Sequence, residues 1–71
     1  MRGNEFIRKI LKHAKATGIA CEWRPERGKG SHGVLILGDR RTVVRNPKDE
    51  LKTGTYHGML KQLGLTERDI F

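Results

Sequence analysis

The sequence predicts an α+β domain in which one helix is followed by three strands and a second helix. Two segments, one near each end of the chain, repeat apolar residues at the three-to-four spacing of one helix face. Between them lie three short β-prone runs separated by turn residues. The chain has 71 residues, so we expect residues 1–71 to form a single domain. Its core should be thin, because so short a chain buries only about 60% of the surface that it exposes when unfolded.

The first predicted helix covers residues 4–17. One face carries the apolar residues Phe6, Ile7, Ile10, Leu11 and Ala14, and the other carries the basic residues Arg8, Lys9, Lys12 and Lys15. We expect Asn4 to cap the start of this helix, because its side chain can accept a hydrogen bond from a free backbone N–H. Gly18 tolerates the left-handed conformation that commonly ends a helix.

The three predicted strands cover residues 19–24, 34–37 and 41–45. In the first, Ile19, Cys21 and Trp23 alternate with Ala20, Glu22 and Arg24, which is the period of a half-buried strand. The second is a continuous apolar run, and a turn at residues 38–40 joins it to the third. Two β-prone runs joined by three residues that include glycine indicate an antiparallel hairpin.

The second predicted helix begins near Thr53 or Thr55, either of which can cap it, and ends at Gly64. Its apolar stripe consists of Tyr56, Met59, Leu60 and Leu63. Thr66 is expected to cap one further short turn over residues 66–69.

A three-stranded antiparallel sheet with both helices on one face would bury all three apolar surfaces in two layers. The other face of the sheet would then be open to solvent. This αβββα order is that of the double-stranded-RNA-binding-domain fold. Topology of this kind predicts an architecture and says little about activity.

The charge balance points to a polyanionic partner. Lysine and arginine number 15 against 8 aspartate and glutamate, which gives a formal net charge of +7. Such an excess attracts polyanions and repels a second copy of the chain. Nucleic acid is the first candidate partner, an anionic membrane surface the second and an acidic protein the third.

Several other classes of protein are not favoured by the composition. A single cysteine, Cys21, cannot form an internal disulfide, and three scattered histidines do not have metal-ligand spacing. We therefore expect neither a metal nor another cofactor. No apolar run approaches the roughly 20 residues of a membrane span, and the first residues lead into an amphipathic helix instead of a signal segment. The expected location is the cytoplasm, with no membrane partner.

The least ordinary segment is Gly28-Lys29-Gly30-Ser31-His32-Gly33. Glycines allow the backbone to approach a ligand closely, and exposed N–H groups can cradle a phosphate. Lys29 adds a positive charge, Ser31 adds a hydroxyl, and His32 can exchange a proton near neutral pH. Basic residues at neighbouring strand positions could enclose the same spot: Arg24, Arg27, Arg41 and Arg45. On the pattern alone, a glycine-rich turn with an exposed histidine is the competing interpretation.

Two blocks of this sequence resemble the HicA-type toxins of bacterial toxin–antitoxin modules. One is Lys29-Gly30-Ser31-His32, and the other is Asp49-Glu50-Leu51-Lys52-Thr53-Gly54-Thr55 followed by Leu60-Lys61-Gln62-Leu63-Gly64-Leu65. The resemblance implies the αβββα fold, an mRNA interferase activity and a HicB-type antitoxin partner. It also implies that the histidine after Gly-Ser, here His32, is catalytic. Many relatives have a second histidine next, where this chain has Gly33.

The sequence thus predicts a toxin that cleaves mRNA without a metal and thereby inhibits translation. His32 is the candidate general base or acid, and Lys29, Arg24 and Arg41 are candidate phosphate-binding residues. The RNA-binding set is completed by Gly30, Ser31, Arg27, Arg45 and Lys52. Three alternatives share the size and charge: a non-catalytic RNA-binding domain, a ribosome-associated basic protein, and a toxin that has lost its activity.

Overall fold

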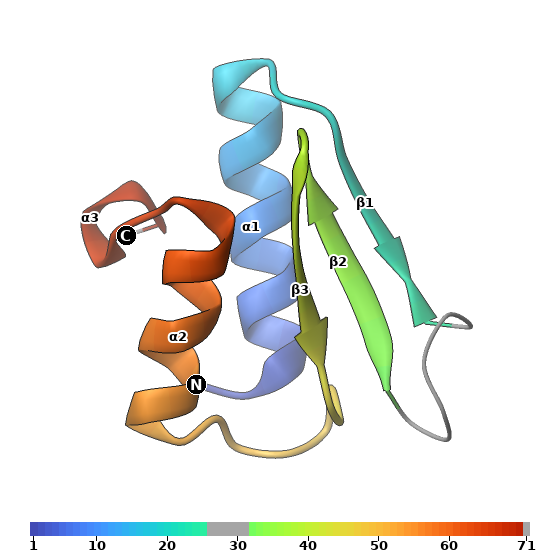
Figure 1. The fold of residues 1–71 in the computed structure, drawn as a ribbon, viewed down its shortest axis with the longest axis vertical. Helices are drawn as coiled ribbons and strands as arrows, with labels where there is room; N and C mark the ends of the chain where they lie inside the picture. The colour runs from blue at the N-terminus through green and yellow to red at the C-terminus, as the bar shows by residue number, and fades with distance from the viewer. Residues whose placement is uncertain (26–31, 71) are drawn as a thin grey trace.

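A computed structural model describes residues 1–25 and 32–70 of the chain. Its elements follow the predicted order, and the further short turn expected over residues 66–69 is a short helix (Figure 1). They are α1 (Gly3–Thr17), β1 (Cys21–Arg24), β2 (Gly33–Leu37), β3 (Arg40–Val44), α2 (Thr53–Leu63) and α3 (Glu67–Ile70). The predicted αβββα fold is therefore confirmed.

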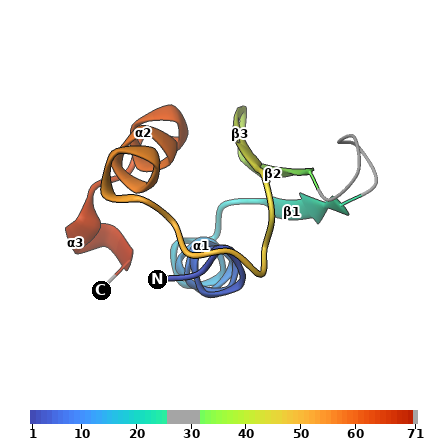
Figure 2. The ribbon, with the colours of Figure 1, turned by 90° about the horizontal axis from the view of Figure 1, so that it is seen from below.

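The three strands form an antiparallel sheet in the order β1-β2-β3. Cys21 pairs with Leu37 and Trp23 with Leu35, while Gly33 pairs with Val44 across the second ladder. The helix α1 lies against β1 and β2, and α2 lies beside β3, on the same side of the sheet (Figure 2). This is the predicted two-layer arrangement, and we call the opposite side of the sheet the open face.

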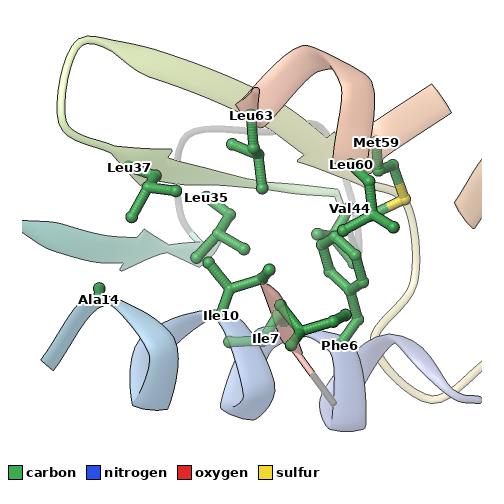
Figure 3. Close-up of a cluster of buried hydrophobic side chains, with 11 residues drawn as sticks. Phe6, Ile7, Ile10, Ala14, Leu35, Leu37, Val44, Met59, Leu60 and Leu63 are labelled. Atoms are coloured by element: carbon green, nitrogen blue, oxygen red, sulfur yellow. The ribbon is translucent and has the colours of Figure 1, made fainter. Parts of the chain in front are cut away.

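The core lies between α1, the inward side of the sheet and α2 (Figure 3). Phe6 and Ile10 of α1 meet Leu35 and Val44 of the sheet, and all four side chains are completely buried. Burial of an apolar side chain of this size contributes about 1.5–3 kcal/mol. The α2 stripe adds Met59, Leu60 and Leu63, while Tyr56 packs half-buried at its edge.

The predicted start of α1 is wrong by one residue, and its predicted cap is wrong. The helix begins at Gly3 after Arg2, so Asn4 lies inside the first turn. The N–H of Gly3 donates to the carbonyl of Asp49 at 3.1 Å, and that of Asn4 donates to the carbonyl of Pro47 at 2.8 Å. A side-chain cap is unnecessary here because a distant part of the backbone accepts these hydrogen bonds.

The start of α2 also differs from the prediction. Lys52 occupies the cap position without a side-chain hydrogen bond, so neither Thr53 nor Thr55 caps the helix. Its end is as predicted: Gly64 is left-handed with φ of 72°, and the N–H of Leu65 donates to the carbonyl of Leu60 at 2.9 Å. The helix therefore ends through the six-to-one hydrogen bond that a left-handed glycine makes possible.

Each of the three strands differs from its predicted bounds by one or two residues, and β2 begins at Gly33 instead of residue 34. Gly38, with φ of 59°, makes the turn so tight that Arg40 already pairs with Leu37, so β3 covers Arg40–Val44 and not 41–45. The first strand begins at Cys21 instead of residue 19, and Ile19 is 42% exposed. The alternation of apolar residues therefore extended further than the strand itself.

The last helix, α3, begins after Thr66, and the side chain of Asp69 binds back to this residue. The backbone N–H and the hydroxyl of Thr66 donate to Asp69 Oδ2 at 2.7 and 3.1 Å. These hydrogen bonds lower the pKa of the Asp69 carboxyl, because they favour its charged form. Ile70 of α3 is buried against the core. Among the helices of the described ranges, none is both long and apolar enough to cross a membrane.

Alanine substitution of Gly58 inside α2 and of Gly64 at its end should change the stability of the protein in opposite directions. A Cβ at Gly58 would meet no atom within 4 Å, so Gly58→Ala should stabilise the protein by about 0.5–1 kcal/mol through helix propensity. Gly64→Ala should destabilise it by about 1–2 kcal/mol, because residue 64 is left-handed. Urea denaturation of both variants measures the two changes, and equal signs would contradict this account.

Candidate nucleic-acid interface

The predicted site residues fall into two groups with respect to the structure. Arg27, Lys29, Gly30 and Ser31 lie outside the described residues. The described ones are His32, Arg24, Arg41, Arg45 and Lys52.

His32 directly precedes β2 at one end of the sheet, and it is half-buried. Gly33 pairs with Val44 in the last rung of this ladder, so His32 and Arg45 are the next residues of the two segments, just beyond the end of the sheet. On the other side of β2, Arg24 pairs with Val34. Val34 and Arg24 lie on the open face, because successive residues of a strand alternate between faces and the neighbours Gly33 and Leu35 are buried. His32 thus stands at the same end of the sheet as Arg24, a predicted phosphate-binding residue, and Arg45, a predicted RNA-binding residue.

Gly33, which follows His32, has a steric reason to be glycine. A Cβ at this position would overlap ring atoms of Trp23 and would lie 2.9 Å from the Cα of Pro25. Trp23 itself is half-buried and packs against the core, as the alternation of β1 predicts. The indole therefore takes the space of a side chain at residue 33, which explains why a second histidine has no room in this chain.

The open face brings Arg24 and Arg41 together. They line one hollow of about 390 Å³ with Val34 and Ile36 between them. Arg24 also pairs with Glu22 of the same strand at 2.9 Å. This carboxylate was not among the predicted site residues, and it neutralises part of the charge that Arg24 could offer to a phosphate. This ion pair could have been predicted from the sequence, because residues 22 and 24 point to the same side of a strand.

Arg45 and Lys52 meet in a second place, the groove between β3 and α2. Both line a hollow of about 230 Å³, but the acidic residues Asp49 and Glu50 line it as well and offset part of their positive charge. An adjoining hollow of about 330 Å³ continues along α2 and is lined by Thr55, Gly58, Met59 and Gln62, none of which was among the predicted site residues. The sequence feature that could have indicated this hollow is the presence of small residues in α2, because they leave space beside the edge strand β3. The described cations are thus arranged as two pairs, one on the open face and one in this groove.

The remaining titratable groups lie apart from these two places. His57 is 52% exposed, and its Nε2 contacts Glu67 Oε1 at 3.1 Å, so it links α2 to α3. Burial raises the pKa of the Cys21 thiol. Within residues 1–25 and 32–70, no three His, Cys, Asp or Glu side chains come close enough together to hold a metal ion.

The fold and charge define a small basic α+β protein whose sheet has one face free of helices and a histidine at one end. The model of the protein family described as "HicA toxin of bacterial toxin-antitoxin" matches residues 19–65, which is about two thirds of the chain. The protein therefore belongs to the HicA toxin family. Membership implies a toxin–antitoxin module and an antitoxin partner. No curated protein and no solved structure matches the chain.

The contact between Gly33 and Trp23 predicts a coupled effect on stability. Gly33→Ala should destabilise the protein by about 1–3 kcal/mol, because an added methyl overpacks a filled site. The same substitution should cost less in a Trp23→Leu background, although the contact with Pro25 remains. Gly54→Ala is the matched control, since nothing lies within 4 Å of its Cβ. Additive effects in this double-mutant cycle would show that the ring does not exclude a side chain at residue 33.

Proposed function

We propose that this HicA family member is an mRNA interferase, a metal-independent endoribonuclease that acts in the cytoplasm, cleaves RNA and so inhibits translation. Residues 1–71 carry this activity as one domain. The observation that carries the proposal is the place of His32: a half-buried histidine directly before β2, at the end of the sheet where Arg24 ends β1 and Arg45 follows β3. Proton transfer and charge stabilisation are then available at one end of the sheet.

RNA supplies its own nucleophile for this reaction. His32 removes the proton of a 2′-hydroxyl, whose oxygen attacks the adjacent phosphorus. The bond to the 5′-oxygen of the next nucleotide breaks, which leaves a cyclic phosphate on one product and a 5′-hydroxyl on the other after protonation. General acid–base catalysis of this kind is typically worth about 10²–10⁴-fold in rate.

The basic side chains stabilise the charge of the phosphate and take no part in proton transfer. Arg45 and Arg24 flank the position of His32 and stabilise the charge that develops on the phosphoryl oxygens. Arg41 and Lys52 bind neighbouring phosphates on the open face and at the mouth of the groove. We include in the same RNA-binding set the block that directly precedes His32 in the sequence, Lys29-Gly30-Ser31, together with Arg27.

Replacement of the histidine tests the proposal directly. In EDTA, wild-type protein should cleave single-stranded RNA, and His32→Ala should reduce the rate by about 10²–10⁴-fold or more. His13→Ala is the matched control, because His13 lies on α1 outside the site. Thermal unfolding should show that both variants are folded.

Two results would contradict the assignment. Undiminished cleavage by His32→Ala would exclude this histidine as the catalytic group. RNA that is retarded in a gel by wild-type protein but stays intact would favour a non-catalytic RNA-binding domain instead, and co-sedimentation with ribosomal subunits would favour a ribosome-associated protein.

The antitoxin in this proposal is of the HicB type and covers His32 together with the open face. That face offers half-buried Val34 and Ile36 between Arg24 and Arg41, which suits a partner with an apolar centre and acidic edges.

Co-expression tests the partner. Growth arrest caused by the toxin should be relieved by the product of the adjacent open reading frame. Association of the two purified proteins should slow as salt rises, because opposite charges steer the encounter. A neighbouring product that leaves the arrest unchanged would contradict the pairing.

A further inference from the structure

The outer side of α1 carries basic residues that the proposed active site does not use. Arg8, Lys12 and Lys15 are exposed and follow one another at intervals of four and three residues, so they form a single row along the helix. They lie opposite the buried face formed by Phe6, Ile7, Ile10 and Ala14. We call these three residues the α1 stripe.

The charges of the α1 stripe are not compensated within the described part of the protein. Neither Arg8, Lys12 nor Lys15 forms an ion pair there. Glu5 is the one acidic residue in the sequence of α1, and its Oε1 accepts a hydrogen bond from the backbone N–H of Arg2 at 3.4 Å. Three uncompensated cations in a row therefore face the solvent.

The stripe is separate from the proposed active site. Because α1 packs its apolar face against the sheet, its basic side points away from the sheet. Figure 2 shows that α1 lies on the side of the sheet opposite the open face. The shorter dimensions of the molecule are 24 and 17 Å. A ligand that reaches both the stripe and His32 must therefore pass around the molecule.

We propose that the α1 stripe is a second contact for the RNA backbone, which holds a long RNA on the side of the fold away from His32. This proposal rests on the proposed ribonuclease function and extends it to the length of the substrate. The stripe spans about 10 Å of helix, at 1.5 Å per residue, and thus faces more than one phosphate. Such contacts position the RNA without reading its sequence.

A nucleic acid suits this surface better than a membrane does. Helices that lie on membranes insert an apolar face into the lipid. The apolar face of α1 is already buried in the core, and beside the stripe only the side chain of Leu11, 37% exposed, is a large exposed apolar group of this helix. The α1 stripe is therefore left with electrostatic binding, which the regularly spaced phosphates of RNA provide.

The test measures binding in the His32→Ala background, so that RNA is not consumed. Arg8→Gln, Lys12→Gln and Lys15→Gln are combined in one variant, since glutamine keeps the helix propensity of the stripe. Lys48→Gln, Lys61→Gln and Arg68→Gln form the control, which removes three charges from exposed positions elsewhere. The dissociation constant is measured against salt for RNAs of about 6 and about 30 nucleotides; the first lies near the lower end of the roughly 4–16 nucleotides that one small single-strand-binding fold covers, and the second lies well beyond that range.

For the long RNA, we expect the stripe variant to bind more weakly and to lose about 2 from the slope of log affinity against log salt, at roughly 0.7 per phosphate contact. The short RNA should bind the stripe variant and the control equally well. With His32 restored, the stripe variant should still cleave the short RNA at the wild-type rate.

Three outcomes would overturn the proposal. Equal slopes for the stripe variant and the control would mean that only net charge matters. Equal losses with short and long RNA would place the stripe in the same site as His32. Loss of binding to phosphatidylglycerol vesicles with unchanged RNA binding would assign the stripe to a membrane. Failure of the wild-type protein to cleave would refute the ribonuclease proposal alone, because the binding experiment does not depend on cleavage.

Discussion

The packing of α1 against the inward side of the sheet is the contact on which the rest of this structure depends. Phe6 and Ile10 bury themselves against Leu35 and Val44, and α2 closes the remaining side. A chain of 71 residues has apolar material for one such core. One face of the sheet and the outer face of α1 are consequently left to the solvent, and they carry most of the charges discussed above.

The order and nature of the main elements followed from periodicity, because helical and strand spacings differ and each apolar stripe had a partner to pack against. The residues at which the helices begin could not be predicted from periodicity. Asn is a residue type that often caps helices, but at the start of α1 the carbonyls of Pro47 and Asp49 accept the first hydrogen bonds instead of the Asn4 side chain. Such partners lie more than forty residues away in the sequence, and no local pattern encodes them. The strand ends moved for a similar reason, since the cross-strand register decides which residues are paired.

The candidate site was predictable in its residue types and less so in its arrangement. The Gly-Ser-His block pointed to His32 through its resemblance to a family, and the basic residues around it were visible from composition. The pairing of Arg24 with Glu22, and the division of the cations between the open face and the β3–α2 groove, depend on register and on helix placement. The steric contact between Gly33 and Trp23 likewise joins two strands and becomes apparent only when both are in place.

The hydrogen bonds that join the first residues to residues 47–51 have a consequence for biosynthesis. Arg2 forms a β-bridge with Glu50, and the N–H of Leu51 donates to the carbonyl of Met1 at 2.9 Å. Closing so long a loop carries an entropic cost, and its contacts form only when both ends are available. During translation, α1 can coil early, but its buried face has to wait until β3 and α2 have emerged. The first turn of α1 therefore lacks its hydrogen-bond partners until residues 47–51 have been synthesised.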